Sequence, residues 1–327
     1  MKYVLGIDQG GTKTHAMVAD ENGRILGMAK AGGACHSAHG MQFAMDKVDE
    51  AAEKALVQSK ISIEQIAVVA AGMTGLDWEE EEELLTEALQ KLFPKQQIHV
   101  VNDCIIAMRA GTDKEQCCVL CAGTGLNCAV RKDADNEFIY GYYVADEYQG
   151  GQALGQKAIQ AVFNAETGLQ PPTALTALLL EFFNVPNTDE LLKRAVTGGI
   201  NDRKKSEIPL LIEKAAMEND WVSLQILENY GRYIAQYVVA GLKRFEMLSD
   251  EVDVILSGSI FKSKVPVLLE ALSAEIHRFS VNAKIISCRY EPIVGAVLMA
   301  LEQLSKPLSP GVYENIEKAA NHFNIER

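Results

Sequence analysis

The sequence predicts an α/β protein of two similar halves, each with the element order βββαβαβα. Two triples of short β-like segments, near residues 3 and 117, are each followed by alternating helical and strand patterns. The length of 327 residues fits two domains at roughly 150 residues each. No Pro/Ser-rich linker interrupts the chain. We therefore place the first domain at 1–115 and the second at 116–327, facing each other across a cleft.

The first half opens with three strand candidates that turn residues separate. Gly10-Gly11 and Asn22-Gly23 are the turns, and both are typical of tight hairpins. Apolar residues at helical spacing then predict a helix over residues 41–60. The strands are Tyr3–Asp8, Thr14–Ala19, Arg24–Ala29, Ile66–Ala71 and Ile98–Asn102, and the other helices cover Trp78–Leu92 and a stretch from Asp103.

The second half repeats this order and adds a helical insertion over about 173–214. Its strands are expected at Cys117–Ala122, Asn127–Arg131, Glu137–Tyr142, Val252–Ser257 and Ala283–Ser287. Its helices are expected at Gly151–Asn164, Ser223–Phe245, after Lys262 and at Pro292–Gln303. The tail, 308–327, holds one more helical pattern, and the sequence leaves open on which domain it packs.

The composition excludes several classes of function. The formal net charge of −13 argues against a nucleic-acid surface or a polybasic membrane anchor. No apolar run is long enough to span a membrane, and the N-terminus does not resemble a signal peptide. Seven scattered cysteines are typical of a reducing compartment. We expect a cytoplasmic protein that binds small molecules.

Each half begins with a strand, a Gly-rich turn and a second strand. The turns lie in residues 8–14, DQGGTKT, and 122–127, AGTGLN. A single such turn is commonly just a hairpin, but two at equivalent positions favour phosphate binding through backbone N–H groups. Neither is a P-loop, because a strand follows each. The hydroxyls of Thr12, Thr14 and Thr124 are additional donors, and Asp8 is placed to hold the water shell of Mg²⁺.

Two further segments end a strand with polar or small residues. Asn102-Asp103 is either a helix N-cap or, at the carboxyl end of a strand, a ligand site. A carboxylate at Asp103 can accept the proton of a hydroxyl that attacks a γ-phosphoryl group. Ser257-Gly258-Ser259 is either a tight turn with a Ser cap or a space for a purine or ribose.

Together these segments resemble the sugar kinase, Hsp70 and actin superfamily. Within it the chain looks like the BadF/BadG/BcrA/BcrD family and most like its N-acetylglucosamine kinase branch. The fold implied is two RNase H-like (actin-like ATPase) domains that close on substrate, and such kinases are commonly homodimers. The resemblance covers residues 3–304 and rests on Gly6–Thr14, Asn102-Asp103, Ala122–Asn127, Leu256–Ser259 and Pro292–Ala296.

The resemblance implies roles for individual residues. Asp103 is the catalytic base and Asp8 holds Mg²⁺ through water. The residues implied to bind ATP are Gly10, Gly11, Thr12, Lys13, Thr14, Gly123, Thr124, Gly125, Gly258 and Ser259. Those implied to bind the sugar are His36, Gly75, Asp77, Asn102, Asn127 and Asp146.

The chain departs from the resemblance at two points. Cys35 stands where the kinases usually have Asn, although His36 is kept. In the loop 144–151 the kinases usually show Gly-Asp-Glu-Gly-Ser, whereas Tyr148-Gln149 replaces the small pair here and the segment is one residue longer. These bulkier residues leave the identity of the sugar open.

The sequence therefore predicts an ATP-dependent kinase of an amino sugar, with the 6-hydroxyl of N-acetylglucosamine as first choice. N-acetylmuramic acid and glucosamine are the next sugars. The alternative is an ATPase that activates a partner redox enzyme, as related activators do with an iron–sulfur cluster. A sugar-sensing regulator without activity is a third alternative. The acidic run Glu79–Glu83 is expected to be a solvated helix face.

Overall fold

The computed structural model describes residues 1–323 and 325. The chain divides into two compact units, Met1–Val119 with Ile286–Arg327, and Leu120–Ile285. The first boundary is close to the predicted one. The sequence, however, predicts that everything after residue 116 forms the second domain. In the structure the C-terminal segment packs with the first unit instead.

The first unit contains a five-stranded mixed sheet with the order β3-β2-β1-β4-β5. β1, β2 and β3 pair antiparallel, whereas β4 and β5 run parallel to β1. In this register Gln9, Met73 and Asn102 are neighbours at the carboxyl ends of the parallel strands. The strands are β1 (Tyr3–Gln9), β2 (Lys13–Asp20), β3 (Ile25–Gly32), β4 (Ile66–Met73) and β5 (Gln97–Asn102).

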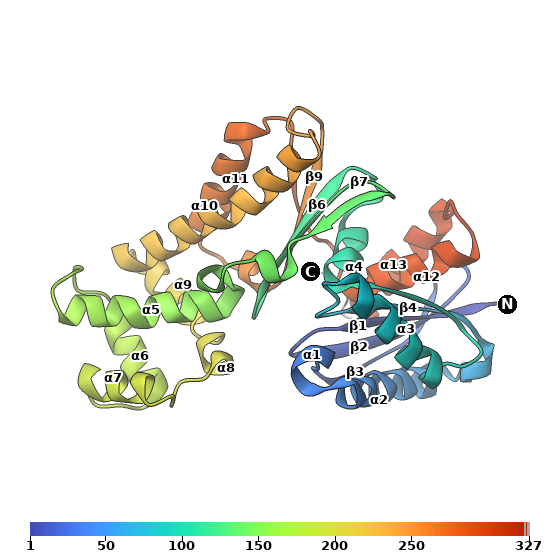
Figure 1. The fold of residues 1–327 in the computed structure, drawn as a ribbon, viewed down its shortest axis with the longest axis horizontal. Coiled ribbons are helices and arrows are strands. Elements are labelled where there is room, and N and C mark those ends of the chain that lie inside the picture. The colour runs from blue at the N-terminus through green and yellow to red at the C-terminus, as the bar shows by residue number, and fades with distance from the viewer. Residues whose placement is uncertain (324, 326–327) are drawn as a thin grey trace. The chain divides into compact units, whose positions relative to one another are not determined.

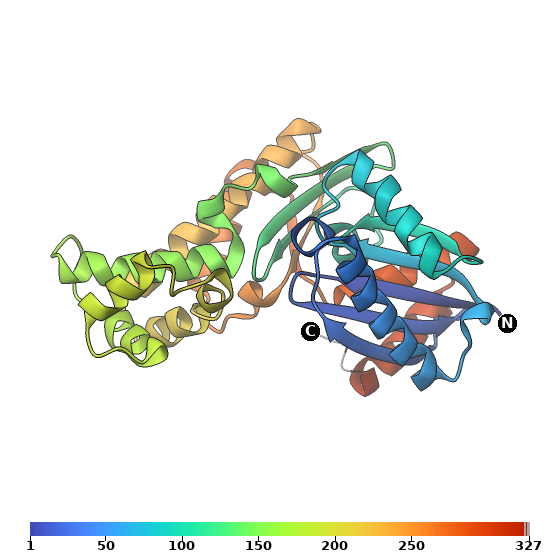
Figure 2. The ribbon, with the colours of Figure 1, turned by 60° about the horizontal axis from the view of Figure 1, so that its bottom comes forward.

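Helices cover both faces of this sheet. α2 (Met41–Ser59) and α3 (Glu79–Leu92) pack their apolar residues on one face. α12 (Pro292–Leu304) and α13 (Pro310–Phe323) cover the other, with Ile106 of α4 (Asp103–Gly111) in the same core. Figure 2 shows α2 in front of these strands and the red helices behind them. A short helix α1 (His36–His39) precedes α2, and a 3-10 turn, Ile63–Gln65, precedes β4.

α12 packs closely within the first unit at two glycines, one on β1 and one on α12 itself. A Cβ on Gly6 of β1 would lie 2.8 Å from Val297. A Cβ on Gly295 would lie 1.8 Å from the carbonyl oxygen of Ile106. The close approach of α12 to β1 and α4 therefore requires both glycines. The tail helix α13 buries Val312 in the same core. The tail therefore packs on the first unit.

The second sheet has the order β10-β9-β6-β7-β8, which repeats the order of the first sheet. Figure 1 labels its strands β9, β6 and β7. The duplication predicted from the sequence is therefore confirmed. β8 ends earlier than predicted, because Gly141, two residues after its end, adopts φ +47° and begins a 3-10 turn. The strands are β6 (Cys117–Ala122), β7 (Leu126–Asp133), β8 (Asn136–Ile139), β9 (Asp253–Ser257) and β10 (Lys284–Ser287).

The helical insertion is also confirmed. It forms α6 (Leu175–Phe183), α7 (Thr188–Val196), α8 (Asp202–Lys205) and α9 (Pro209–Met217). The other helices of this unit are α5 (Gly150–Glu166), α10 (Trp221–Arg244) and α11 (Val267–Phe279), with 3-10 turns at Gly141–Tyr143, Asp146–Tyr148 and Ser259–Lys262. Among the described residues, no helix is both long and apolar enough to cross a lipid bilayer.

Candidate active site

Asp103 is the first residue of α4 and directly follows β5. Asn102 caps the helix, because its Oδ1 accepts the N–H of Cys104 at 2.9 Å. The predicted N-cap at this position is thus confirmed for Asn102. The cap leaves the Asp103 carboxyl at the carboxyl edge of the sheet, where open α/β sheets bind ligands.

The surroundings of Asp103 favour a carboxyl group that ionises near neutral pH. Burial raises its pKa, and the carboxylates of Asp8 and Asp77 raise it further, to about 7. Hydrogen bonding to Asp103 from the Thr74 side chain and the Cys104 backbone lowers its pKa and partly opposes this rise. A carboxylate with a pKa near the working pH is suited to general base catalysis.

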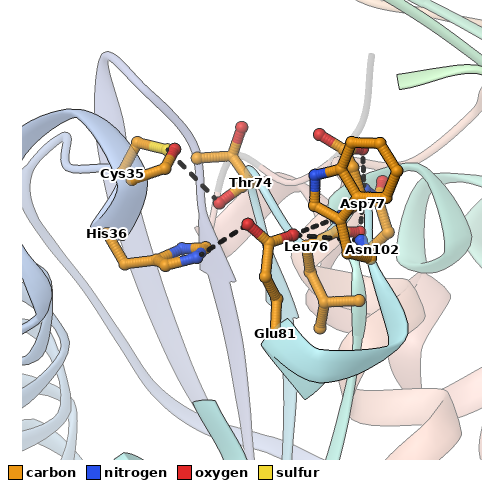
Figure 3. A network of polar contacts seen from close by, with 9 residues as sticks. Cys35, His36, Thr74, Leu76, Asp77, Glu81 and Asn102 are labelled. Atoms are coloured by element: carbon orange, nitrogen blue, oxygen red, sulfur yellow. Dashed lines mark hydrogen bonds and ion pairs between the residues drawn. The ribbon is translucent and has the colours of Figure 1, made fainter. Parts of the chain in front are cut away.

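Asn102 connects this helix to the loop after β4. Its Nδ2 donates to the carbonyl oxygen of Leu76 at 2.8 Å and to Oδ1 of Asp77 at 3.1 Å (Figure 3). With Oδ1 in the N-cap bond, both ends of this buried side chain bind the protein itself. The sequence predicts a sugar contact for Asn102. In the structure its amide binds Leu76, Asp77 and the N–H of Cys104.

Glu81 of α3 is not part of a solvated face. Its Oε2 accepts the backbone N–H groups of Asp77 at 2.8 Å and Trp78 at 3.0 Å, and its Oε1 lies 3.4 Å from Nε2 of His36. The prediction of a solvated face is therefore wrong at this position, because the side chain reaches back over the helix N-terminus as a capping box does. Burial and the nearby Glu81 raise the pKa of Asp77.

The segment around Cys35 packs against the same loop. Cys35 Sγ lies 3.6 Å from the carbonyl oxygen of Thr74. A Cβ on Gly75, at φ +80°, would lie 2.6 Å from this sulfur. Only glycine allows this approach. The structure thus brings His36, Gly75, Asp77 and Asp103 into one connected network of the first unit.

The first Gly-rich turn leaves Gly11, Thr12 and Lys13 exposed. The N–H of Gly10 donates to the carbonyl oxygen of Lys13 at 2.9 Å and closes the hairpin. Thr14 differs from the prediction. It is fully buried in β2, and its hydroxyl donates to the carbonyl oxygen of Gly32 at 2.9 Å, so it is not free for phosphate.

Two ionisable side chains near this turn were not predicted to lie beside its residues. Lys13 Nζ lies 3.3 Å from Oε2 of Glu291, just before α12. His15 is buried directly across from Asp8, with its Nδ1 3.5 Å from Oδ2. Neither ring nitrogen of His15 has a hydrogen-bond partner in the described part of the chain. The antiparallel hairpin register would have revealed the His15–Asp8 pair from the sequence.

The second Gly-rich turn is fastened to the start of α5. The N–H of Gly151 donates to the carbonyl oxygen of Gly123 at 2.8 Å. Gly150 has φ +52°, and a Cβ there would lie 2.2 Å from the carbonyl oxygen of Gly125. Gln149 joins the two segments, because its Oε1 accepts the N–H of Leu126 at 3.2 Å.

This packing explains the bulkier residues of the loop 144–151. Gln149 braces the turn, and Tyr148 stacks on Tyr233 of α10 with ring centroids 3.2 Å apart. The hydroxyl of Tyr230 donates to the carbonyl oxygen of Tyr148 at 3.1 Å. The tyrosines of α10 are therefore packing residues, as their helical spacing indicates. Asp146 is exposed at the start of the 3-10 turn.

The other predicted residues of the second unit have distinct surroundings. Gly258 has φ +115°, and a Cβ there would lie 2.1 Å from the carbonyl oxygen of Ala122, so the turn after β9 meets the end of β6. Ser259 begins the following 3-10 helix. Asn127 Oδ1 accepts the N–H of Gly141 at 2.9 Å and of Cys128 at 2.8 Å. The side-chain oxygen of Asn127 thus accepts hydrogen bonds from within the protein.

The family model of the BadF/BadG/BcrA/BcrD ATPase family matches residues 5–300. The chain belongs to this family. An N-acetylmuramic acid/N-acetylglucosamine kinase of Clostridium acetobutylicum is 24% identical over 92% of this chain and 98% of its own. An N-acetyl-D-glucosamine kinase of Dictyostelium discoideum is 25% identical over 91% and 97%.

Solved structures support the fold of this BadF/BadG/BcrA/BcrD ATPase family member. A ROK family glucokinase from Streptomyces griseus, in complex with glucose and AMPPNP, has a TM-score of 0.61 at 19% identity. It covers 92% of this chain, and 99% of its own chain is matched. A Chromobacterium violaceum protein has a TM-score of 0.70 at 20% identity, with the same coverage. The predicted fold class is confirmed.

Proposed function

We propose that this family member is an ATP-dependent carbohydrate kinase that phosphorylates an amino sugar, with Asp103 as general base. The observation that carries the proposal is the Asp103 carboxyl at the carboxyl end of β5, with a pKa of about 7 beside Asp8 and Asp77. The names of the curated relatives, both sugar kinases, support the substrate class.

Positioning and proton removal are the tasks of this chain's residues in phosphoryl transfer. Asp103 accepts the proton of the attacking hydroxyl as the oxygen bonds to the γ-phosphorus. The Thr74 hydroxyl, which donates to Asp103, holds the carboxylate in place for this transfer. As this bond forms, the bond between the γ-phosphorus and the oxygen that bridges to the β-phosphate breaks. The products are the sugar phosphate, ADP and protonated Asp103.

The residues near Asp103 fit Mg²⁺ held mainly by water and phosphate. The Asp8 side chain is 11% exposed. No group of three candidate ligand side chains occurs in the part of the chain that is described. Mg²⁺ usually binds through one or two carboxylates and keeps several waters, which suits a single Asp8. When bound, the ion neutralises charge on the phosphates.

ATP would be held mainly by backbone N–H groups. In the first unit, Gly10 closes the turn through its own N–H group, and the exposed Gly11 and Thr12 offer the donors. Gly123, Thr124 and Gly125 offer an equivalent turn in the second, and Gly258 and Ser259 are proposed to lie against the adenosine. Lys13 is proposed to reach phosphate only by leaving Glu291, since the two form an ion pair.

The sugar residues proposed are His36, Gly75 and Asp77 in the first unit and Asn127 and Asp146 in the second. N-acetylglucosamine is the first substrate, through its 6-hydroxyl, and N-acetylmuramic acid and glucosamine follow. We also propose a cytoplasmic homodimer. All seven cysteines lie among the described residues and none forms a disulfide, which fits a reducing compartment.

An ADP-release screen of the purified protein tests the function. N-acetylglucosamine, N-acetylmuramic acid, glucosamine, glucose and N-acetylmannosamine are compared at equal concentration with MgATP. Turnover fastest with an amino sugar supports the proposal. Turnover with none of these sugars, or ATP hydrolysis that no sugar stimulates, would refute it.

The pH dependence of the reaction follows from the raised pKa of Asp103. We expect kcat/KM to rise as the pH increases through about 7 and to level off above it, because only the carboxylate accepts a proton. Asp77→Asn removes one neighbouring negative charge and should move the midpoint to lower pH. Initial rates between pH 5.5 and 9 at constant ionic strength measure this, and a rate independent of pH across 7 contradicts it.

A further inference from the structure

The His36 ring is nearly enclosed, with its side chain 9% exposed. Its two nitrogens differ. Nε2 lies 3.4 Å from Oε1 of Glu81, whereas Nδ1 is buried without a hydrogen-bond partner among the described residues. Nδ1 is therefore the ring atom whose hydrogen-bonding capacity the described residues leave unused.

The position of the Glu81 carboxylate favours one tautomer of His36. A carboxylate oxygen beside Nε2 favours a proton on that nitrogen. In the neutral ring Nδ1 then carries a lone pair and can only accept a hydrogen bond. The complementary ligand group is a hydroxyl or an amide N–H, and both are present on an N-acetylated sugar.

The same carboxylate also fixes the loop beside the proposed base. Oε2 of Glu81 accepts the N–H groups of Asp77 and Trp78, as described above. This loop contacts Asn102, the residue before Asp103 (Figure 3), and hydrogen bonding from the Thr74 side chain acts on the Asp103 carboxyl. One side chain, itself 16% exposed, therefore contacts both the His36 ring and the loop that adjoins Asp103.

We propose that Glu81 is a positioning residue for the sugar, which acts by holding His36 as the Nε2–H tautomer with Nδ1 as acceptor. The inference rests on the proposed function and extends it to a specificity element. It predicts that the substrate presents a hydrogen-bond donor to His36. Glu81 itself contacts no substrate in this proposal.

Glu81→Gln separates this role from helix capping. The backbone N–H groups of Asp77 and Trp78 require an acceptor. The amide oxygen that the substitution introduces should therefore take the place that Oε2 of the carboxylate has in the parent protein. The amide NH₂ then faces Nε2 of His36 and favours the proton on Nδ1. Glu80→Gln, an exposed neighbour on the same helix, is the matched control.

The first readout is the ¹⁵N chemical shifts of the His36 ring, measured without substrate at a pH where the ring is neutral. We expect the Nε2–H tautomer in the parent protein and in Glu80→Gln, and the Nδ1–H tautomer in Glu81→Gln. The same tautomer in all three proteins would overturn the proposal. This readout does not depend on which reaction the protein catalyses.

The second readout is kinetic. In Glu81→Gln we expect the KM for the sugar to rise about ten-fold, as for loss of one buried hydrogen bond, with the KM for ATP unchanged. In a His36→Phe background the same substitution should have no further effect on the sugar KM. An unchanged sugar KM, or an equal effect without His36, would overturn the proposal. If the parent protein phosphorylates no sugar, the proposed function fails, while the tautomer result still decides whether Glu81 orients His36.

Discussion

Asp103→Asn is expected to lower kcat by about 10²–10⁴-fold, the usual contribution of a general base. The amide cannot accept the hydroxyl proton, although it retains the size of the carboxyl and its position at the start of α4. Binding of the sugar and of ATP should change little, because Asp103 acts on the proton and not on the phosphates. Single-turnover rates and calorimetric binding measure the two effects separately.

The same variant should be more stable than the parent protein at pH 8. The pKa of Asp103 is raised from 3.8 to about 7 in the folded protein, so ionisation of this group opposes folding. The stability associated with the protonated form is present below pH 3.8 and is lost as the pH rises to 7. Asparagine avoids this loss, so its melting temperature should exceed that of the parent above pH 7 and converge with it in acid.

Asp113→Asn, an exposed position in the same unit, is the matched control for both measurements. It should leave kcat and the pH dependence of stability unchanged. Turnover retained by Asp103→Asn would refute the assignment of the base. A loss of turnover with unfolded protein would be recognised by the melting curve.

Gly258→Ala is expected to destabilise the second unit by about 3 kcal/mol and to raise the KM for ATP. The backbone at φ +115° is a conformation open mainly to glycine, and the new Cβ would lie 2.1 Å from the carbonyl oxygen of Ala122. Backbone strain and collision therefore add. Denaturant unfolding and initial rates against ATP concentration measure the effects.

Gly168→Ala separates strain from collision. Gly168 has φ +76°, but no atom lies within 4 Å of a Cβ built there. It should cost only about 1 kcal/mol, the penalty of a left-handed alanine. Equal destabilisation by the two variants would show that contact with Ala122 does not constrain the turn after β9.

The fold could be predicted from the sequence because its signals are local. Hairpin glycines, period-two strands and amphipathic helices recur in the same order in each half, and the two sheets repeat one topology. The assignment of α12 could not be predicted. Gly6 and Gly295 carry no apolar pattern, and their fit to Val297 and Ile106 becomes visible only in three dimensions.

The site shows the same division. Asp103 and Asp8 could be proposed from the sequence because a strand end and a Gly-rich turn mark them. Thr14 was predicted to donate its hydroxyl to phosphate because it lies in a ligand-like motif. In the structure this hydroxyl donates to the carbonyl oxygen of Gly32 within the sheet. Glu81 was missed because five consecutive acids look solvated, and only the reversal of its side chain toward Asp77 distinguishes it.

The return of the C-terminus to the first unit has a consequence for synthesis of the chain. The first sheet emerges early from the ribosome, but one of its faces stays uncovered until α12 is made. More than half of the chain lies between Val119 and α12. At ordinary translation rates of about 5–20 residues per second, this delay is on the order of ten seconds or more. The second unit is continuous and can finish folding earlier. Nascent chains stalled before residue 292 should therefore expose the apolar face around Val4 and Met17, which makes them substrates for chaperones or proteases.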